Sequence, residues 1–245
     1  KPTDETKHFG IELEFFANWN QSKLGVALND AGLSEVVQLK TDGSIRARDG
    51  MHGHELNICV KESELRSTLE RVCQVLTEAG ADVNKSCGMH VHIDMRTRDK
   101  EKVFSNLVSA QTILYAMNPP SRKYGYQDNG NKRHYAKPNV GKDFQTARRS
   151  GRYHGVNASA FDKFKTLEVR LHAGTVDPRK ILNWVLILDA VSNLETEVAR
   201  GPSTVTGFKR LYNIPETLMS YITERVEKFR SAHESRDTST EDVAA

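Results

Sequence analysis

Three short segments of this chain carry carboxylates and imidazoles at alternate positions, and this pattern limits the fold more than any other feature. The segments are Phe9–Phe15, Cys87–Asp94 and Thr166–His172. A β-strand directs alternate side chains to opposite faces, so each segment is predicted to be a strand with one polar and one aliphatic face. Three such strands in one sheet would gather hard oxygen and nitrogen ligands on one surface, which suits Mg²⁺ or Mn²⁺.

The polar positions of these segments are the first candidate site residues. They are Glu12 and Glu14 in the first segment, His90, His92 and Asp94 in the second, and Glu168, Arg170 and His172 in the third. Taken singly, each set has an ordinary interpretation as solvated carboxylates, structural histidines or a mixed surface ladder. The aliphatic and aromatic neighbours of the first pair indicate a buried strand, where like charges are costly unless a cation neutralises them. A carboxylate two residues from an arginine also suits phosphoryl transfer.

Size and composition place the chain among globular proteins of one large domain or two small ones. The longest apolar run, Ile181 to Val191, is too short and too polar to span a bilayer. Three cysteines without metal-type spacing leave at least one thiol unpaired, which favours free thiols and a cytoplasmic location.

The charge of the chain is concentrated in one segment. The whole chain has a formal net charge of +3, whereas residues 119–165 hold eleven Lys and Arg against three Asp. Such a segment is expected to meet an anionic ligand. Glycines, a proline and weak periodicity within residues 121–152 indicate an active-site loop.

The periodicity predicts one α+β domain over residues 1–231, an antiparallel sheet of about six strands covered by helices. The predicted strands are Phe9–Phe16, Val36–Ile45 with a break near Asp42-Gly43, Gly53–Val60, Gly88–Met95, Tyr153–Ala160 and Thr166–His172. The predicted helices are Glu62–Ala79, Asp99–Met117, Pro178–Ala199 and Ile214–Ser231. Pro178–Ala199 is apolar on most sides and is expected to be buried. Residues 232–245 are predicted to be a disordered tail.

Several motifs, taken in order, resemble those of the amidoligase family, a branch of the glutamine synthetase and glutamate–cysteine ligase superfamily. They are Gly10–Phe15, Thr41–Ser44, Gly53–Leu56, Cys87–His92, Gly155–Asn157 and Thr166–Thr175. The resemblance implies a glutamine-synthetase-like catalytic domain that binds ATP and Mg²⁺ or Mn²⁺. Such enzymes phosphorylate a carboxylate and let an amine displace the phosphate, which makes an amide.

The resemblance also implies roles for individual residues. The metal ligands would be Glu12, Glu14, Glu55, Glu168, His90 and His92. The catalytic groups would be Arg170 on the phosphoryl group, Asp42 for the incoming amine, and Glu55. The nucleotide contacts would be Arg170, Asn157, Lys40, Arg152 and His172. From the residues alone, Lys40 has the simpler interpretation of offsetting the charge of Asp42.

Two other functions remain open at this point. A metal-dependent hydrolase or phosphatase could use the same glutamates and histidines without ATP. A nucleic-acid-binding module would use residues 119–165, but it leaves the acidic strands unexplained. The acid and amine could be small molecules, peptides or nucleotides, and the sequence indicates neither membrane association nor an oligomeric state.

Overall fold

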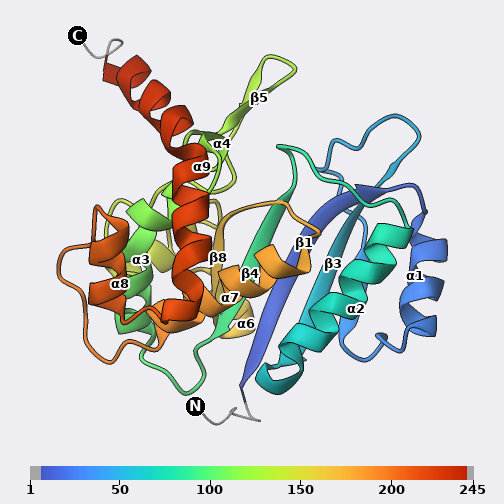
Figure 1. Ribbon diagram of the computed structural model, residues 1–245, viewed down its shortest axis with the longest axis horizontal. Helices are drawn as coiled ribbons and strands as arrows, with labels where there is room; N and C mark the ends of the chain where they lie inside the picture. The colour runs from blue at the N-terminus through green and yellow to red at the C-terminus, as the bar shows by residue number, and fades with distance from the viewer. Residues whose placement is uncertain (1–6, 242–245) are drawn as a thin grey trace. The chain divides into compact units, whose positions relative to one another are not determined.

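The computed structural model describes residues 7–241, which form two compact units (Figure 1). The first unit consists of residues 7–94 and 173–185, and the second of residues 95–172 and 186–241. Apart from one short hairpin, the described residues form six antiparallel strands, four in the first unit and two in the second, so the predicted α+β class and strand number are confirmed. The single domain over residues 1–231 and its glutamine-synthetase-like character stay predictions.

The first unit is an antiparallel sheet with helices on its hydrophobic face. Its strands run in the order β2, β3, β1 and β4, and each neighbouring pair is antiparallel. Burial alternates along β1, where Ile11 and Leu13 are at most 1% exposed and Glu12 and Glu14 are half-buried. The elements are β1 (His8–Ala17), α1 (Gln21–Asp30), β2 (Val37–Lys40), β3 (His52–Lys61), the 3₁₀ turn η1 (Glu62–Glu64), α2 (Leu65–Glu78) and β4 (Gly88–Asp94).

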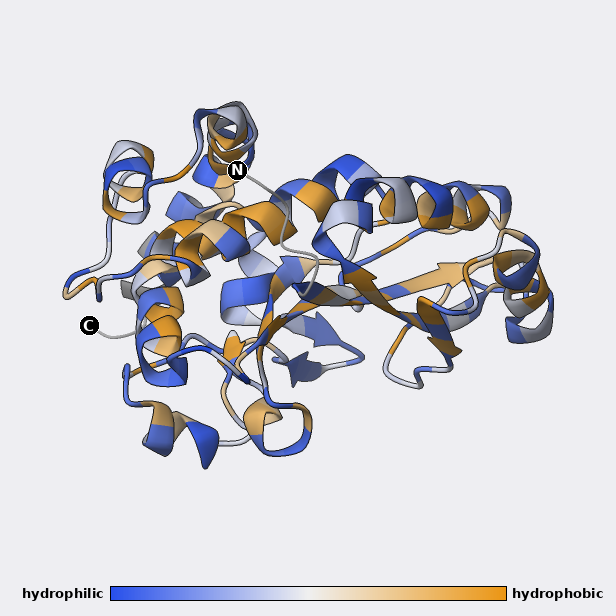
Figure 2. Ribbon diagram, turned by 90° about the horizontal axis from the view of Figure 1, so that it is seen from below, coloured by the Kyte–Doolittle hydropathy of each residue, from blue (hydrophilic) through white to orange (hydrophobic). Residues whose placement is uncertain are grey.

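Helix α2 packs against the sheet through the apolar face that its periodicity predicts. Leu65, Leu69, Val72 and Leu76 are all buried, and α2 contacts β3 and α1. Figure 2 shows hydrophobic residues, in orange, along both the strands and the helices of this unit. Gly80 follows the helix at φ +67°, a left-handed conformation that glycine adopts without strain and that ends the helix. The polar residues of the strands lie on the opposite face of the sheet.

The second unit is mostly helical around one strand pair and one hairpin. Strand β7 pairs with β8, β5 pairs with β6, and α3 contacts α8 and α9. The elements are α3 (Lys100–Ala116), α4 (Pro120–Tyr124), β5 (Tyr126–Asp128), β6 (Asn131–Arg133), α5 (Phe144–Arg148), β7 (Val156–Asn157), α6 (Ala160–Phe164), β8 (Thr166–Ala173), α8 (Val205–Tyr212) and α9 (Glu216–Glu241). Helix α7 (Pro178–Ser192) begins in the first unit and ends in the second. Its Trp184, Val185 and Leu188 are fully buried, as predicted for a central helix.

Three element boundaries differ from the prediction. The strand expected at Val36–Ile45 ends at Lys40, because Asp42-Gly43-Ser44 forms a turn. The strand expected at Tyr153–Ala160 is reduced to Val156–Asn157, because Ser159 turns onto the Asn157 side chain and Ala160 opens α6. Helix α7 ends at Ser192, where the Asn193 side chain donates to Asp189 within the last turn.

The predicted disordered tail is helical as far as Glu241. Helix α9 is extended because its outer turns are attached to residues 118–124 of the same unit. The His233 ring contacts the Asn118 carbonyl at 2.8 Å, and Asp237 lies 3.4 Å from the Lys123 ammonium. The rest of the predicted tail lies outside the described residues. All three cysteines are free, as predicted.

Candidate active site

Two histidines hold one glutamate on the polar face of the first unit's sheet. Glu12 is paired in register with His90 on β4, and Gly10 with His92. The two oxygens of Glu12 lie 3.1 Å from His90 Nδ1 and 3.1 Å from His92 Nε2. Burial alone would raise the pKa of Glu12, but the hydrogen bonds and charges of the two histidines outweigh it and lower the pKa well below its usual range. Glu12 therefore remains ionised, and each of its oxygens is held by one imidazole.

A glycine makes this arrangement possible. A Cβ atom at position 10 would lie 3.0 Å from the Cβ of His92, closer than side chains ordinarily pack. The missing side chain therefore lets His92 lie against β1 and reach the carboxylate two residues further along the strand. Gly10 is accordingly a packing requirement of the site.

The second glutamate of β1 belongs to a separate group of three carboxylates. One oxygen of Glu14 accepts a 2.6 Å hydrogen bond from the Gly88 backbone, and the other lies 3.7 Å from His90 Nε2. Glu14 is paired in register with Glu55 on β3. Glu14, Asp42 and Glu55 each contribute one carboxylate oxygen, and these three oxygens lie within 4.8 Å of one another. We refer to these three residues as the carboxylate trio.

The position of Asp42 in the trio follows from a local turn. The Ser44 amide donates a 2.7 Å hydrogen bond to Asp42 Oδ1, which is the turn expected of Asp42-Gly43-Ser44. The turn follows directly after β2 and fixes the carboxylate near the end of that strand. Asp42, predicted as the group that meets the amine, therefore lies with two of the predicted metal ligands.

Lysine and asparagine side chains border the trio on β2 and β3. Lys40 Nζ lies 3.9 Å from Glu55 Oε1, and the two residues are register partners. In the amide orientation that satisfies both neighbours, Asn57 donates to Glu55 at 3.0 Å and accepts from Lys40 at 2.7 Å. Burial and the nearby charges of Glu12 and Glu14 raise the pKa of Glu55 despite Lys40. The trio therefore has more negative charge than its neighbours offset.

The donor set of the trio fits a hard divalent cation. Its three members are half-buried carboxylates, which are the oxygen ligands that Mg²⁺ and Mn²⁺ prefer. Ligand atoms around one octahedral Mg²⁺ lie about 3–4 Å apart, so small side-chain rotations would bring these oxygens to coordination distance. Burial raises the pKa of Glu55 most, neighbouring carboxylates raise it further, and a bound cation would offset that repulsion.

The remaining predicted carboxylate, Glu168, is held in the second unit. Its oxygens accept a 2.6 Å hydrogen bond from Arg170 Nη1 and another of 2.6 Å from the Asn157 amide. Arg170 Nε also donates to the Tyr135 carbonyl at 3.1 Å. The Glu168 and Arg170 side chains are only 7% and 11% exposed. They form a buried pair oriented by neighbouring polar groups, which favours a fixed arrangement of the guanidinium.

The other two predicted nucleotide contacts differ in accessibility. His172 on β8 is buried at 2% exposure. Arg152 is exposed, and its guanidinium lies 5.1 Å from the centre of the Tyr153 ring. The structure therefore brings five predicted metal ligands together in the first unit and places Glu168, Arg170, Asn157, His172 and Arg152 in the second.

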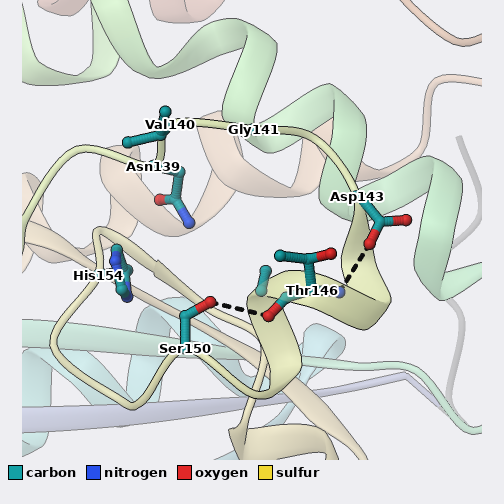
Figure 3. Close-up of a pocket in the computed structure, with 8 residues that line it drawn as sticks. Asn139, Val140, Gly141, Asp143, Thr146, Ser150 and His154 are labelled. Carbon is teal, nitrogen blue, oxygen red and sulfur yellow. Dashed lines mark hydrogen bonds between the residues drawn. The ribbon is translucent and has the colours of Figure 1, made fainter.

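The second unit also has a pocket of about 240 Å³ within the predicted basic loop. Figure 3 shows Asp143 accepting from the Thr146 backbone and Ser150 donating to the Thr146 carbonyl. Both bonds stabilise the ends of the short helix α5. None of the predicted site residues lines this pocket; its lining residues are Asn139, Val140, Gly141, Asp143, Thr146, Ala147, Ser150 and His154.

A comparison with known protein families gives a match in the first half of the chain. The family model described as "putative amidoligase enzyme" matches residues 33–123. The resemblance to amidoligases is confirmed over these residues. The matched amidoligase segment contains Asp42, Glu55, His90 and His92, whereas β1 and β8 lie outside it. A comparison with curated protein sequences found no match. Within residues 7–241, none of the helices has both the length and the apolar character needed to span a membrane.

The amidoligase description supports an amide-forming ligase in general terms. Sequence reasoning did not assign three of the groups that shape the site: the Asn57 amide, the Gly88 backbone amide and the Tyr135 carbonyl. Asn57 had a usable signal, because it follows Glu55 by two residues on the same strand face. The two backbone groups could not be predicted, because the sequence specifies side chains and not the position of backbone amides and carbonyls.

Proposed function

We propose that this protein is an ATP-dependent carboxylate–amine ligase that uses Mg²⁺ or Mn²⁺ and forms an amide through an acyl phosphate. The observation that carries the proposal is the carboxylate trio of Glu14, Asp42 and Glu55, of which Asp42 and Glu55 lie in the segment that matches the amidoligase family. A bound divalent cation would neutralise phosphate oxygens during transfer of the phosphoryl group.

The residues of the chain have distinct roles in this proposal. The carboxylate trio holds the cation, and Lys40 and Asn57 keep Glu55 oriented toward it. Both oxygens of Glu12 are already engaged by two imidazoles, so in this proposal Glu12 orients His90 and His92 and contributes less to cation affinity than Glu14. The proposal thus ranks two glutamates to which the sequence pattern gives equal weight.

Arg170 is the proposed group for the transferred phosphoryl oxygens. Its Nε and Nη1 atoms are fixed by the Tyr135 carbonyl and Glu168, so the planar group is held in one orientation. A guanidinium oriented in this way presents donors to spread negative charge without reorganising at the moment of transfer. The proposal assigns Glu168 the role of holding Arg170 as well as the metal role that the resemblance implies.

The proposal is tested by ADP release from ATP and Mg²⁺ with a panel of carboxylic acids and amines. We expect release that requires an acid and increases with an amine, together with an amide product detected by mass spectrometry. Glu14→Gln should abolish the Mg²⁺-dependent release of ADP. Glu70→Gln, which alters an exposed glutamate on α2, should leave that release intact. Cleavage of phosphate esters with metal alone, and no acid-dependent ADP release, would support a metallohydrolase instead.

A further inference from the structure

The second unit carries nearly all the excess positive charge of the chain. Residues 119–165 lie entirely within it and have a net charge of about +8, while the whole chain has +3. The rest of the chain is therefore acidic, at about −5. A separation of charge on this scale creates a local positive potential that attracts polyanions.

The acidic residues of this segment do not neutralise the surplus. Asp162 pairs with Arg148, Asp128 lies 3.9 Å from Arg133 in the β5–β6 hairpin, and Asp143 caps helix α5. Lys137 and Arg149 are exposed. Neither forms a salt bridge in the described part of the chain, although the charge of Arg149 acts on nearby Asp143. Their charges remain available to an external ligand.

Exposed aromatic rings occur in the same segment. Within residues 7–237, Tyr153 and Phe164 are the two most exposed aromatic side chains, at 41% and 54%. Each has a cation against its ring: Arg152 lies 5.1 Å from the centre of Tyr153, and Lys163 lies 4.9 Å from that of Phe164. A cation beside an exposed ring can contact a phosphate while the ring stacks on a base.

Backbone contacts join part of this surface into one group. Lys137 donates from its backbone to the Tyr153 carbonyl at 2.8 Å and accepts from Gly155 at 2.7 Å. The Tyr135 and Tyr153 rings meet edge to face, with centres 5.6 Å apart. These contacts place Lys137, Arg152 and the two tyrosines beside one another on the second unit.

From this combination we infer that the second unit binds single-stranded nucleic acid across a basic–aromatic surface centred on Tyr135, Lys137, Arg152 and Tyr153, with Arg149 and Phe164 as further contacts from the same segment. Lysine and arginine contact the phosphates, and the rings stack on unpaired bases. An acidic peptide would use the cations but would leave the rings exposed. A duplex buries its base faces, so it would not use the rings either. This binding does not depend on the ligase activity.

Fluorescence anisotropy of the whole protein with labelled oligothymidylate and oligouridylate of about 20 nucleotides tests the inference, at about 50 and 200 mM NaCl. We expect binding at low salt that weakens at least about tenfold at the higher salt. Lys137→Ala with Arg149→Ala should reduce affinity at least about tenfold and lower the salt slope by about 1.4, because each phosphate contact on a single strand contributes about 0.7. Tyr153→Ala with Phe164→Ala should lose about tenfold without changing that slope.

Matched variants separate this surface from general charge effects. Lys61→Ala with Arg66→Ala removes the same charge from exposed positions of the first unit and should change affinity less than about twofold. Tyr153→Phe keeps the ring and should also bind. The inference is wrong if the control pair loses as much affinity as the Lys137 and Arg149 pair. It is equally wrong if a glutamate-rich peptide or a duplex binds as tightly as the single strands, or if no oligonucleotide binds at low salt.

Discussion

Glu55→Gln should make the metal-free protein more stable, which is the reverse of the usual effect of altering a half-buried charged residue. The carboxylate oxygens of Glu14 and Asp42 lie within 4.8 Å of that of Glu55. Two unit charges at that distance repel by about 1.7 kcal/mol at an effective dielectric constant of about 40, between the near-surface and bulk-water values. Removal of one charge relieves two such repulsions.

The gain is reduced by the loss of an attraction. Lys40 Nζ lies 3.9 Å from Glu55, and this pair is worth about 2 kcal/mol at the same dielectric constant. The net expectation is a gain of about 1 kcal/mol at pH 7 and low salt. For a chain of 245 residues this corresponds to a rise of about 2–4 °C in melting temperature.

The pH dependence has a definite sign. Burial and neighbouring carboxylates raise the pKa of Glu55 in the folded protein, so folding is penalised when Glu55 ionises. The wild type therefore loses this part of its stability as the pH rises through the folded pKa. The advantage of Glu55→Gln should be present at pH 7 and should disappear below the ordinary glutamate pKa of about 4.3.

Thermal melts of EDTA-treated wild type, Glu55→Gln and Glu70→Gln at several pH values would measure these effects. The Glu70 variant should match the wild type throughout. Added Mg²⁺ should raise the melting temperature of the wild type more than that of Glu55→Gln, because the cation relieves the same repulsion. A lower melting temperature for metal-free Glu55→Gln at pH 7 would show that Glu55 is a structural carboxylate and would refute the reasoning.

Three further outcomes follow from other contacts. Glu168→Gln should destabilise the protein by about 1.5–3 kcal/mol in chemical denaturation, because it removes a charge-assisted bond to buried Arg170; unchanged stability would contradict the observed pair. Arg170→Lys should slow ADP release at least about tenfold while changing Mg-ATP affinity less in calorimetry, and a selective loss of affinity would remove its phosphoryl role. Gly10→Ala should cost about 1–3 kcal/mol because its Cβ would meet His92 at 3.0 Å, whereas Gly25→Ala, with open space around it, should not destabilise.

Much of the first unit could be predicted from the sequence. The strands β1, β3 and β4 were recognisable because alternation of polar and aliphatic residues has only one interpretation when the aliphatic face is buried. Helix α2 was recognisable for the same reason, since four apolar residues recur at helical spacing. Helix α1 was missed because only Leu24 and Leu28 are buried in it, which gives too weak a period.

The organisation of the site depended on cross-strand register, which the sequence does not contain. Alternation placed Glu12 and Glu14 on one face, but only the register pairs the first with His90 and the second with Glu55. The two glutamates therefore have different partners although their local sequence is nearly the same. Asp42 joined the trio because a turn bond to Ser44 orients it, which the sequence indicated only as a turn.

The proposed reaction makes an amide from a carboxylic acid that ATP has activated. The direct measurement is the fate of ¹⁸O in the carboxylate of an acid that supports ADP release with Mg²⁺ and an amine. Because the acid oxygen leaves with the phosphoryl group when the amine displaces it, we predict one ¹⁸O atom in the inorganic phosphate for each amide formed. Phosphate that carries no ¹⁸O from the acid, with its new oxygen derived from water, would contradict the acyl-phosphate route and indicate a hydrolase.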